Sequence, residues 1–308
     1  MSRIEIVTFG EVLWDVFEIA PDTYRRVIGG APANLAVVLA RLGVRAAVIG
    51  AVGVDAFGEA LRARLAAEGV STSSLLRPPE RTGLTFVHTG PRGEPSFLFY
   101  RHETADMMLR REHLRPKMLR ATFAVCGTST LMDKGLRQAT LRFVELARRE
   151  GASLVVDLNV RAHLWKDARS MRKRIAELTP HAAIIKASTA DVKALGGTRF
   201  LQRHCRKATV FLTRGSGRAE AWGAHGSVER PAKRVRCVDA TGAGDAFLGG
   251  ALAVLVARGA VPGSRAWTDP AVFSDALEVG HMLGAKAVSK VGAVTGVVGL
   301  RQAKGMLR

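Results

Sequence analysis

One stretch of the sequence combines glycines, a helix start and a carboxylate in a way that could support phosphate chemistry. Residues 238–250 read VDATGAGDAFLGG, which predicts a glycine-bearing turn running into an apolar helix over residues 246 to about 257. The first N–H groups of a helix lack intrahelical acceptors and carry about half a positive charge, so phosphate is a natural ligand there. Gly242 and Gly244 let the backbone approach such a ligand closely.

Asp245 is unexpected in this stretch, because a carboxylate repels an anion. As a helix cap it would accept N–H groups two or three residues further on. As a general base it would take the proton from a hydroxyl group that attacks the phosphate. Position alone does not separate these two roles.

Polar residues in four other stretches lie beside glycines or at predicted strand ends. Residues 29–34 place two glycines before a helix that carries Asn34, whose amide offers a donor and an acceptor to a polyol. Asp15 lies among large apolar residues and can accept two sugar hydroxyls. A tight turn with a surface Asn, or a turn cap, would explain these residues structurally. Residues 157–161 end a strand with three polar groups, and residues 212–217 form a strand-to-glycine turn that suits a nucleotide.

Strands and helices alternate along most of the chain, which predicts an α/β domain with one largely parallel sheet. Glycine stops and apolar periodicity mark the first helices. We expect strands over residues 4–10, 46–50, 122–126, 153–157, 183–186 and 209–213, and helices over residues 31–43, 57–68 and between the later strands.

Two segments interrupt this alternation. Residues 11–30 contain no convincing helix, and residues 83–89 and 96–101 predict a hairpin with a loose turn at residues 90–95. We expect these segments to form a small separate sheet, a lid over the carboxyl edge of the main sheet, where ligands of α/β folds usually bind.

The composition is that of a globular chain with a basic surface. Of 308 residues 47% are apolar, which is enough for a buried core. No apolar run approaches the roughly 18 residues of a membrane span. Although 46 Lys plus Arg against 27 Asp plus Glu give a net charge of +19, the basic residues are dispersed and aromatic residues total only 6%. We therefore favour a solvated basic surface, which would also steer anions such as ATP and sugar phosphates, over a nucleic-acid interface.

The cysteines and the N-terminus suggest a compartment. Cys126, Cys205 and Cys237 are widely spaced and form no metal-ligand pattern, so we expect reduced thiols. The N-terminus leads directly into strand-like sequence without a signal peptide. These features predict a cytoplasmic protein.

Taken together, the motifs resemble those of the ribokinase-like sugar kinases, the phosphofructokinase-B family, and within it the fructokinase branch. The resemblance covers nearly the whole chain. Its signature regions are residues 29–43 and 239–250, and the second matches the family pattern Asp-Thr-x-Gly-Ala-Gly-Asp except at Ala240. The fructokinase branch is indicated by Phe99-Tyr100-Arg101 with Ala105-Asp106, by residues 157–161 with Leu164-Trp165, and by Ile184-Ile185-Lys186.

This resemblance implies a ribokinase-like three-layer α/β/α domain with a mostly parallel central sheet and a small β-sheet lid. Residues 1–11, 31–82 and 104–308 would form the nucleotide-binding and catalytic core, and residues 12–30 and 83–103 the lid over the sugar site. The implied activity is an ATP-dependent, Mg²⁺-requiring transfer of the γ-phosphoryl group to a primary hydroxyl of a small sugar, with D-fructose as the first choice.

The resemblance also implies roles for individual residues. Asp245 would be the catalytic base, and the N–H groups of Gly242, Ala243 and Gly244 would form the anion hole. The sugar would contact Asp15, Gly29, Gly30 and Asn34 from below, Phe99, Tyr100 and Arg101 from the lid, and Arg161, with Phe17 and Phe97 as apolar cover. The nucleotide and its phosphates would contact Asn159, Lys186, Ser188, Thr213, Gly215, Gly217 and His281, with Asp191 acting indirectly on Mg²⁺.

Three positions depart from the family pattern. Ser188-Thr189-Ala190-Asp191 replaces Asn-x-x-Glu, so Mg²⁺ affinity can differ. His281 replaces an Asn that often borders adenine, which leaves the nucleotide preference open. Ala240 removes a hydroxyl near a loop that binds a monovalent cation in some members, which argues against potassium activation.

Several alternatives fit the same residues. The acceptor could be 2-keto-3-deoxygluconate, ribose or a nucleoside, and Arg101 and Arg161 keep a sugar phosphate open. A sugar- or nucleic-acid-binding regulator would use the +19 charge, but it would not need the intact Asp245 loop. The lid strands could also pair with a second copy to form a homodimer.

Overall fold

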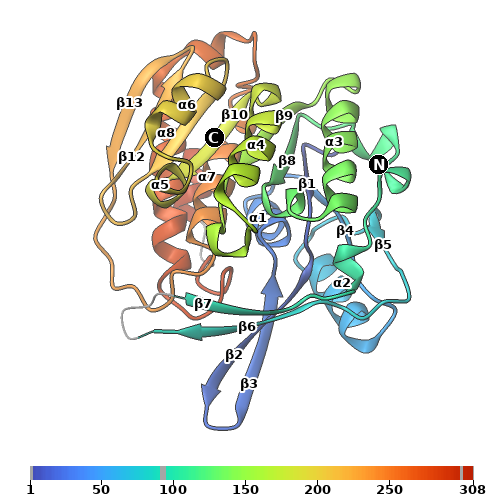
Figure 1. The fold of residues 1–308 in the computed structure, drawn as a ribbon. Coiled ribbons are helices and arrows are strands. Elements are labelled where there is room, and N and C mark those ends of the chain that lie inside the picture. The colour runs from blue at the N-terminus through green and yellow to red at the C-terminus, as the bar shows by residue number, and fades with distance from the viewer. Residues whose placement is uncertain (1–2, 91–94, 299–300, 308) are drawn as a thin grey trace.

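A nine-stranded sheet forms the centre of the protein, in the order β13-β12-β11-β10-β9-β8-β1-β4-β5 (Figure 1). The computed structural model describes residues 3–90, 95–298 and 301–307. The seven strands from β11 to β5 in this order pair in parallel. Strand β12 pairs antiparallel with both β11 and β13. The strands are β1 Ile6–Phe9, β4 Ala46–Ala51, β5 Leu75–Leu76, β8 Phe123–Gly127, β9 Ser153–Asp157, β10 Ile184–Ser188, β11 Thr209–Thr213, β12 Arg218–Gly223 and β13 Gly226–Pro231.

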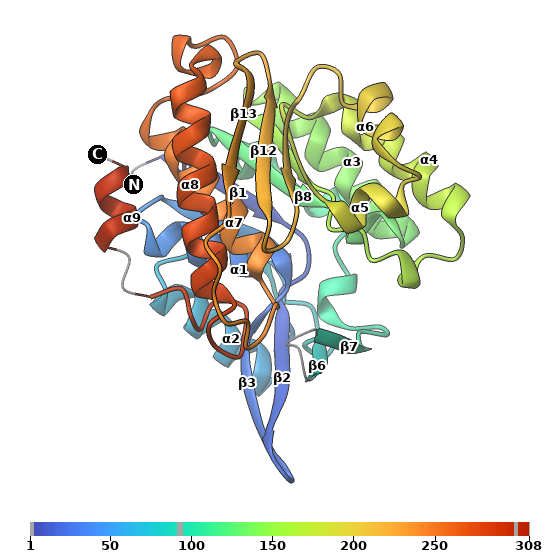
Figure 2. The same ribbon diagram turned by 90° about the vertical axis from the view of Figure 1, so that its left-hand side faces the viewer.

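Helices cover both faces of this sheet, which makes three layers (Figure 2). Every residue of β1 and of β4 is buried, as expected for parallel strands covered on both sides. One face packs against α1 Ala31–Arg41, α2 Ala56–Ala67, α7 Ala243–Ala257, α8 Pro270–Ala287 and α9 Arg301–Met306. The other packs against α3 Lys134–Arg149, α4 Ala168–Leu178, α5 Thr189–Ala194 and α6 Thr198–His204.

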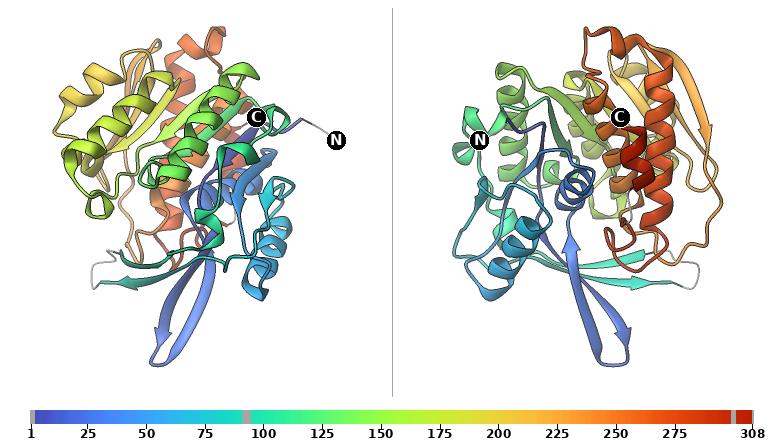
Figure 3. Two further views of the ribbon diagram at one scale, coloured as in Figure 1. Left: turned by 45° about the vertical axis from the view of Figure 1, so that its right-hand side comes forward. Right: turned by 180° about the vertical axis from the view of Figure 1, so that it is seen from behind.

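A second sheet of four strands, in the order β3-β2-β6-β7, lies below the carboxyl ends of the parallel strands (Figure 1 and Figure 3). Its strands are β2 Leu13–Ala20, β3 Thr23–Gly29, β6 Leu84–Thr89 and β7 Pro95–Tyr100. Both hairpins are antiparallel, and β2 pairs with β6 in parallel. The predicted small sheet is confirmed, while residues 91–94 of the predicted turn lie outside the described residues. We call this sheet the lid.

The fold departs from the sequence expectations in two places. Helix α7 begins at Ala243 and not at residue 246, because Gly242 adopts a left-handed conformation with φ of 74° and ends the preceding loop. The β12–β13 hairpin carried no predicted strand, although it extends the main sheet. In the part of the chain that the structure describes, none of the helices combines the length and apolar character needed to cross a membrane.

Candidate active site

A cavity lies between the lid and the carboxyl ends of the parallel strands, and we call it the lid cavity. Residues from both sheets and from the start of α7 line it. Gly30, Pro32, Phe97 and Phe99 contribute to its lining. Its polar lining residues are Thr8, Glu11, Asp15, Asn34, Thr85, Arg101, Thr128, Ser129, Asp157, Asn159, Arg161, Thr241 and Asp245.

The loop before α7 is held by a fully buried carboxylate. Asp239 accepts hydrogen bonds from the Thr241 N–H at 2.9 Å and hydroxyl at 2.6 Å, and from the Gly292 N–H at 2.8 Å. A Cβ atom at Gly242 would lie 2.4 Å from Cβ of Ala293, so only glycine fits beside this returning chain. Asp239 therefore fixes the loop from both sides.

The N-terminus of α7 exposes backbone donors. The Ala243 N–H donates to the Ala240 carbonyl at 3.3 Å, whereas the N–H groups of Gly242 and Gly244 have no acceptor among the described residues. A Cβ at Gly244 would lie 2.6 Å from Nζ of Lys186, so this ammonium group sits next to the helix start. The arrangement suits an anion, with Gly242 and Gly244 better placed to donate than Ala243.

Asp245 lies in the first turn of α7 and does not cap it. Its Oδ2 accepts a hydrogen bond from Nδ2 of Asn34 on α1 at 3.0 Å. Burial raises the pKa of Asp245 to about 6, and the Asp157 carboxylate adds to the rise, while the Asn34 hydrogen bond opposes it. A carboxyl group with this pKa can accept a proton at neutral pH.

Asn34 has a second polar atom in the cavity. Its Oδ1 is buried and receives no hydrogen bond from any residue within the described ranges. The side chain is only 3% exposed. An unpaired buried acceptor is costly, so Oδ1 favours a ligand that brings a hydroxyl donor.

Asp15 extends from lid strand β2 and is 5% exposed. Burial raises the pKa of Asp15 to about 8, and the Asp245 carboxylate contributes to the rise. A Cβ at Gly29 would lie 2.4 Å from Cγ of Asp15, so Gly29 makes room for this carboxyl group and does not itself line the cavity. Gly30 does line the cavity.

Strand alternation decides which lid residues face the cavity. Phe97, Phe99 and Arg101 line it, with the two phenyl rings stacked at 5.9 Å. Arg161 reaches from the core to within 4.9 Å of the Phe97 ring centroid, so core and lid touch there. Tyr100, expected at the sugar, points to the opposite face of the lid and is 58% exposed. Phe17, expected as cover, is 1% exposed and packs outside the cavity lining.

Lys186 and Asp157 lie behind the α7 N-terminus as a buried ion pair at 3.2 Å. Burial alone would lower the pKa of Lys186, but the carboxylates of Asp157, Asp191 and Asp245 raise it, so the side chain stays an ammonium group. Asn159, with φ of 33°, lines the lid cavity next to this pair.

Asp191 and Ser188 form a capping box at the start of α5. Oδ2 of Asp191 accepts from the N–H and the hydroxyl of Ser188, both at 2.7 Å. Its Oδ1 accepts from the Val160 N–H at 2.6 Å, which anchors the loop that carries Asn159. Ser188 does not line the lid cavity or a second cavity beside the β12–β13 hairpin, because its hydroxyl is used in the cap. Any effect of Asp191 on a metal would thus be indirect.

The donor set fits a Mg²⁺ ion only in company with phosphates. Among the described residues, no group of three or more His, Cys, Asp or Glu could hold a metal ion. Asp157 offers one buried carboxylate near Lys186. Mg²⁺ is usually bound through one or two carboxylates together with substrate phosphates, which matches this arrangement.

A second cavity lies on the other side of the α7 start, beside the β12–β13 hairpin, and we call it the hairpin cavity. Glycine and apolar residues dominate its lining. Gly217 falls outside it, in the turn where its N–H donates to the Arg214 carbonyl. The lining residues are Thr213, Gly215, Ser216, Ala232, Lys233, Val235, Cys237, Ala240, Ala243, Gly244, Phe247, His281, Gly284, Ala285 and Val288.

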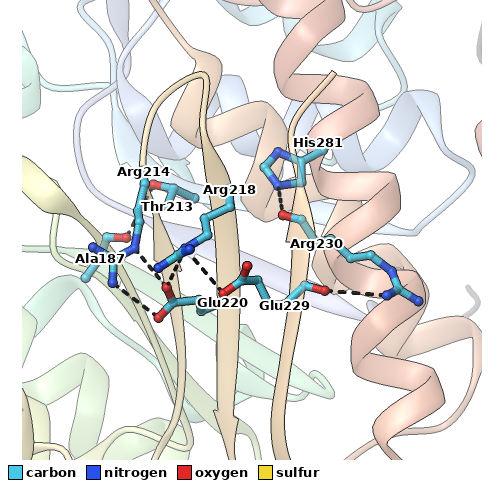
Figure 4. Close-up of polar contacts among 8 residues, drawn as sticks. All are labelled: Ala187, Thr213, Arg214, Arg218, Glu220, Glu229, Arg230 and His281. Carbon is cyan, nitrogen blue, oxygen red and sulfur yellow. Dashed lines mark hydrogen bonds and ion pairs between the residues drawn. The ribbon is translucent and has the colours of Figure 1, made fainter. Parts of the chain in front are cut away.

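Charged pairs cross the β12–β13 hairpin and the turn before it, next to the hairpin cavity (Figure 4). Arg214 and Arg218 both contact Glu220, at 2.9 and 3.1 Å, and Arg218 also reaches Glu229 at 3.3 Å. The arginines are 38% and 50% exposed, so each pair adds little to stability. Their geometry nevertheless orients the turn that carries Gly215.

His281 is the polar side chain that α8 contributes to the hairpin cavity. Its Nε2 lies 3.1 Å from the Arg230 carbonyl oxygen (Figure 4). A carbonyl only accepts, so Nε2 carries the proton and Nδ1 of the neutral ring is an acceptor. Burial lowers the pKa of His281 below its usual range, which keeps the ring neutral.

The sequence patterns gave no role to Glu11, Asp239 or Thr241, which line or brace the site. Glu11 accepts from the Ser129 hydroxyl at 2.8 Å and Asp239 from the Gly292 N–H at 2.8 Å, and both partners are distant in sequence. Thr241 donates to Asp239, two residues before it, but residue type and spacing do not mark this pair. The position of Asp157 at the end of a buried strand did indicate a site residue, and Asp157 lines the lid cavity.

The chain is similar over most of its length to known carbohydrate kinases. Residues 3–298 match the family described as pfkB family carbohydrate kinase. A probable fructokinase-4 from Arabidopsis thaliana is 33% identical over 307 residues, covering 94% of this chain and 92% of that protein. A fructokinase from Klebsiella pneumoniae is 33% identical over 292 residues, covering 91% and 92%.

Two solved kinase structures are similar to this chain over nearly its whole length. A fructokinase with bound ATP from Xylella fastidiosa has a TM-score of 0.85 and 29% identity, with 98% of each chain covered. An aminoimidazole riboside kinase from Salmonella enterica, complexed with aminoimidazole riboside and an ATP analogue, has a TM-score of 0.84 and 27% identity, with 99% of this chain and 100% of that chain covered.

Proposed function

The chain belongs to the pfkB family of carbohydrate kinases, and from this premise we propose that it transfers the γ-phosphoryl group of ATP to a primary hydroxyl of a sugar in the lid cavity. One observation carries the proposal. Thr241, Gly242 and Asp245 line the lid cavity, while Ala243 and Gly244 line the hairpin cavity. The loop therefore stands between two binding spaces, as a phosphoryl transfer between two substrates requires.

Asp245 acts as the base in this proposal. Its Oδ2, oriented by Asn34, takes the proton from the sugar hydroxyl as that oxygen attacks the γ-phosphorus, the bond from the γ-phosphorus to the bridging oxygen breaks, and ADP leaves. The N–H groups of Gly242 and Gly244 and the α7 dipole stabilise charge that develops on the phosphoryl oxygens. Lys186, held by Asp157, places a positive charge behind the same point.

Mg²⁺ would be held by the nucleotide phosphates with help from Asp157, and it would neutralise phosphate charge. Asp191 supports this side of the site by anchoring the Val160 N–H. Thr213, Gly215 and His281 would contact the nucleotide in the hairpin cavity. Ala240 offers no hydroxyl there, so we expect no potassium requirement.

The charges of the lid cavity favour an uncharged acceptor. Four carboxyl groups line it, those of Glu11, Asp15, Asp157 and Asp245. Of the two lining guanidinium groups, that of Arg101 is already paired with a buried carboxylate. Asp15 is mostly protonated at neutral pH and Asp157 is paired with Lys186, so Glu11 and Asp245 are left against the guanidinium of Arg161. A sugar phosphate or the carboxylate of 2-keto-3-deoxygluconate would therefore meet a net negative charge. A neutral sugar would not, and since the curated relatives are named fructokinases, D-fructose phosphorylated at O6 is our first choice.

A substrate panel tests this proposal. ADP formation is measured with ATP and Mg²⁺ against D-fructose, ribose, a purine nucleoside, 2-keto-3-deoxygluconate and fructose 6-phosphate. We expect the highest kcat/KM with D-fructose and poor use of the two anionic acceptors. No turnover with any acceptor would refute the kinase function. A preference for an anionic acceptor would refute the assignment of the acceptor.

The outer face of the lid supports a homodimer as part of the proposal. Tyr24, Leu98 and Tyr100 are 55%, 60% and 58% exposed on it. Phe86 lies between the two tyrosines and packs edge to face with both. Such an exposed apolar sheet face suits a second copy of the chain. Light scattering after size exclusion should give a dimer that Leu98→Glu converts to a monomer, and a monomeric wild type would refute this point.

The same proposal places the enzyme in the cytoplasm without a nucleic-acid partner. Many basic side chains are paired with acidic ones across the surface, such as Arg45 with Glu5 and Arg120 with Glu150. A dispersed basic surface of this kind suits steering of ATP more than a defined nucleic-acid interface. A gel shift that persists at physiological salt would contradict it.

A further inference from the structure

A buried carboxyl group, that of Asp106, lies at the root of the lid, which is the place where the lid strands join the core. The proposed reaction gives this group no role. Asp106 belongs to a short 3-10 helix, Ala105–Met107, which follows the last lid strand. Its side chain is 0% exposed. A carboxyl side chain this deeply buried requires specific partners, and these partners show what it does.

The first partner is Arg101, the residue that follows β7. Its Nε and Nη2 lie 2.7 and 2.6 Å from the same oxygen of Asp106, Oδ2. The other oxygen, Oδ1, accepts from the Thr104 hydroxyl at 2.7 Å. The third guanidinium nitrogen of Arg101, Nη1, has no hydrogen-bond partner among the residues described, and Arg101 lines the lid cavity. Because Asp106 engages Nε and Nη2 of Arg101, Nη1 is the guanidinium nitrogen left to donate to a ligand.

The second contact is with the root of β6. A Cβ at Gly83 would lie 2.5 Å from Oδ1 of Asp106. The Gly83 carbonyl accepts from the Trp14 N–H at 3.2 Å, at the start of β2. The roots of β2, β6 and β7 therefore meet around a single carboxylate, and this point joins the lid to the core.

We propose that Asp106 is a positioning residue for the phosphoryl transfer. It holds the Arg101 guanidinium so that Nη1 donates to an acceptor hydroxyl, and it fixes the root of the lid so that the closed lid excludes water from Asp245. This inference rests on the proposed kinase function, since it needs the acceptor in the lid cavity. No bond to Asp106 forms or breaks in the reaction.

A carboxylate is required at this position because its negative charge pairs with the Arg101 guanidinium. An Asn side chain of the same shape could keep its oxygen toward Arg101 and donate its NH₂ group to the Thr104 hydroxyl, but it would lose that charge. The loss of a hydrogen bond to a charged group corresponds to about a 10- to 100-fold change in affinity. The Asp106→Asn variant therefore changes the chemistry with little change in volume.

The test compares Asp106→Asn with wild type under saturating ATP and Mg²⁺ and a variable sugar, using the full chain. We expect the sugar KM to rise about 10- to 100-fold while the ATP KM stays within about twofold. Hydrolysis of ATP without sugar, relative to kcat, should rise because water enters under the lid. As a matched control, Glu177→Gln breaks the Glu177–Arg137 pair between α3 and α4, away from both cavities, and should change neither KM.

A double-mutant cycle separates positioning from simple support of the fold. If Asp106 acts through Arg101, then Arg101→Gln with Asp106→Asn should have the same sugar KM as Arg101→Gln alone. Additive effects, or equal rises in both KM values, would overturn the inference. Should Asp106→Asn fail to fold, Gly83→Ala displaces the carboxylate without removing it and should raise the sugar KM alone. An unchanged sugar KM in the variant that folds refutes the inference only, whereas a wild type silent on all acceptors refutes the kinase function.

Discussion

The lid cavity and the hairpin cavity meet at one loop but are lined in different ways. The lid cavity is lined by carboxyl, amide and guanidinium groups that buried contacts hold in place, such as Asn34 on Asp245. The hairpin cavity is lined mainly by glycine, alanine, valine and phenylalanine, and the nearby ion pairs of the β12–β13 hairpin are exposed and outside its lining. We infer that the acceptor is selected by charge and hydrogen bonds, and the nucleotide by shape and backbone donors.

The two cavities should also differ in how much a substitution changes the stability of the fold. Buried polar groups with incomplete partners destabilise a fold, whereas small apolar residues around a cleft do not. The lid cavity contains two carboxyl groups with pKa values raised to about 8 and about 6, those of Asp15 and Asp245. Substitutions there should therefore affect both catalysis and stability, and substitutions in the hairpin cavity away from the start of α7 should have small effects on either.

The largest expected effect is that of Asp245→Ala. Removing a positioned base lowers kcat by about 10²- to 10⁴-fold. Because Asp245 would act on the proton and not on the nucleotide, the ATP and sugar dissociation constants should stay close to those of wild type. Stopped assays for kcat and calorimetric titration for binding measure the two effects separately. A kcat near that of wild type would rule out the base role.

Asp15→Asn should weaken the acceptor side and stabilise the fold. At pH 8.5, where Asp15 is mostly ionised, we expect about a 10- to 100-fold higher sugar KM from the loss of a charged acceptor. The pKa of Asp15 is raised above its ordinary value of 3.8, so the stability from its protonated form is complete below about pH 4 and is lost as pH rises through about 8. The variant should thus exceed wild type in unfolding free energy at pH 8.5 by up to about 5 kcal/mol.

Chemical denaturation at pH 4 and pH 8.5 checks the stability part of this prediction. The gain of Asp15→Asn over wild type should be much larger at the higher pH. If the gain in unfolding free energy is the same at both pH values, burial does not raise the pKa of the Asp15 carboxyl group.

The pH profile should show both carboxyl groups of the lid cavity. Below pH 6, where Asp245 is protonated, kcat/KM should fall at least about tenfold per pH unit. In wild type kcat/KM should go on rising between about pH 6 and 8 as Asp15 ionises, and in Asp15→Asn it should already be flat over that range. Identical profiles for the two proteins would contradict the role of ionised Asp15.

The smallest expected effect is that of His281→Leu in the hairpin cavity. The neutral ring offers Nδ1 as an acceptor, which favours the amino group of ATP over the carbonyl of ITP. Loss of one neutral hydrogen bond should reduce the ATP/ITP ratio of kcat/KM by about 2- to 10-fold, with little change in kcat. Coupled assays with both nucleotides give the ratio directly, and a change of 100-fold would show that the nucleotide side is more selective than we infer.

The sequence predicted those features that depend on local pattern. Strand and helix alternation indicated the large sheet, and the break in it indicated the lid, because periodicity and glycine stops are local signals. The loop with Asp245 was found for the same reason. In contrast, the orientation of Tyr100 depends on the pairing of β7 with β6, where a shift of one residue exchanges the two faces.

Long-range contacts account for the remaining differences. The role of Asp239 depends on the Gly292 N–H, which lies 53 residues further along the chain. The use of Ser188 in a cap depends on Asp191 facing back toward it and not toward a phosphate. Neither arrangement has a signature in residue type or spacing alone.

The unpaired Oδ1 of Asn34 has a consequence for how the enzyme tells sugars from their deoxy analogues. No group among the described residues donates to this oxygen, so in a complex that excludes water its donor must come from the ligand, and a sugar hydroxyl would supply it. An analogue that lacks this hydroxyl would leave the oxygen unpaired in the complex, and sites built in this way reject such analogues far more strongly than the loss of one contact suggests. Selectivity would then originate in an acceptor that only the complete substrate can satisfy.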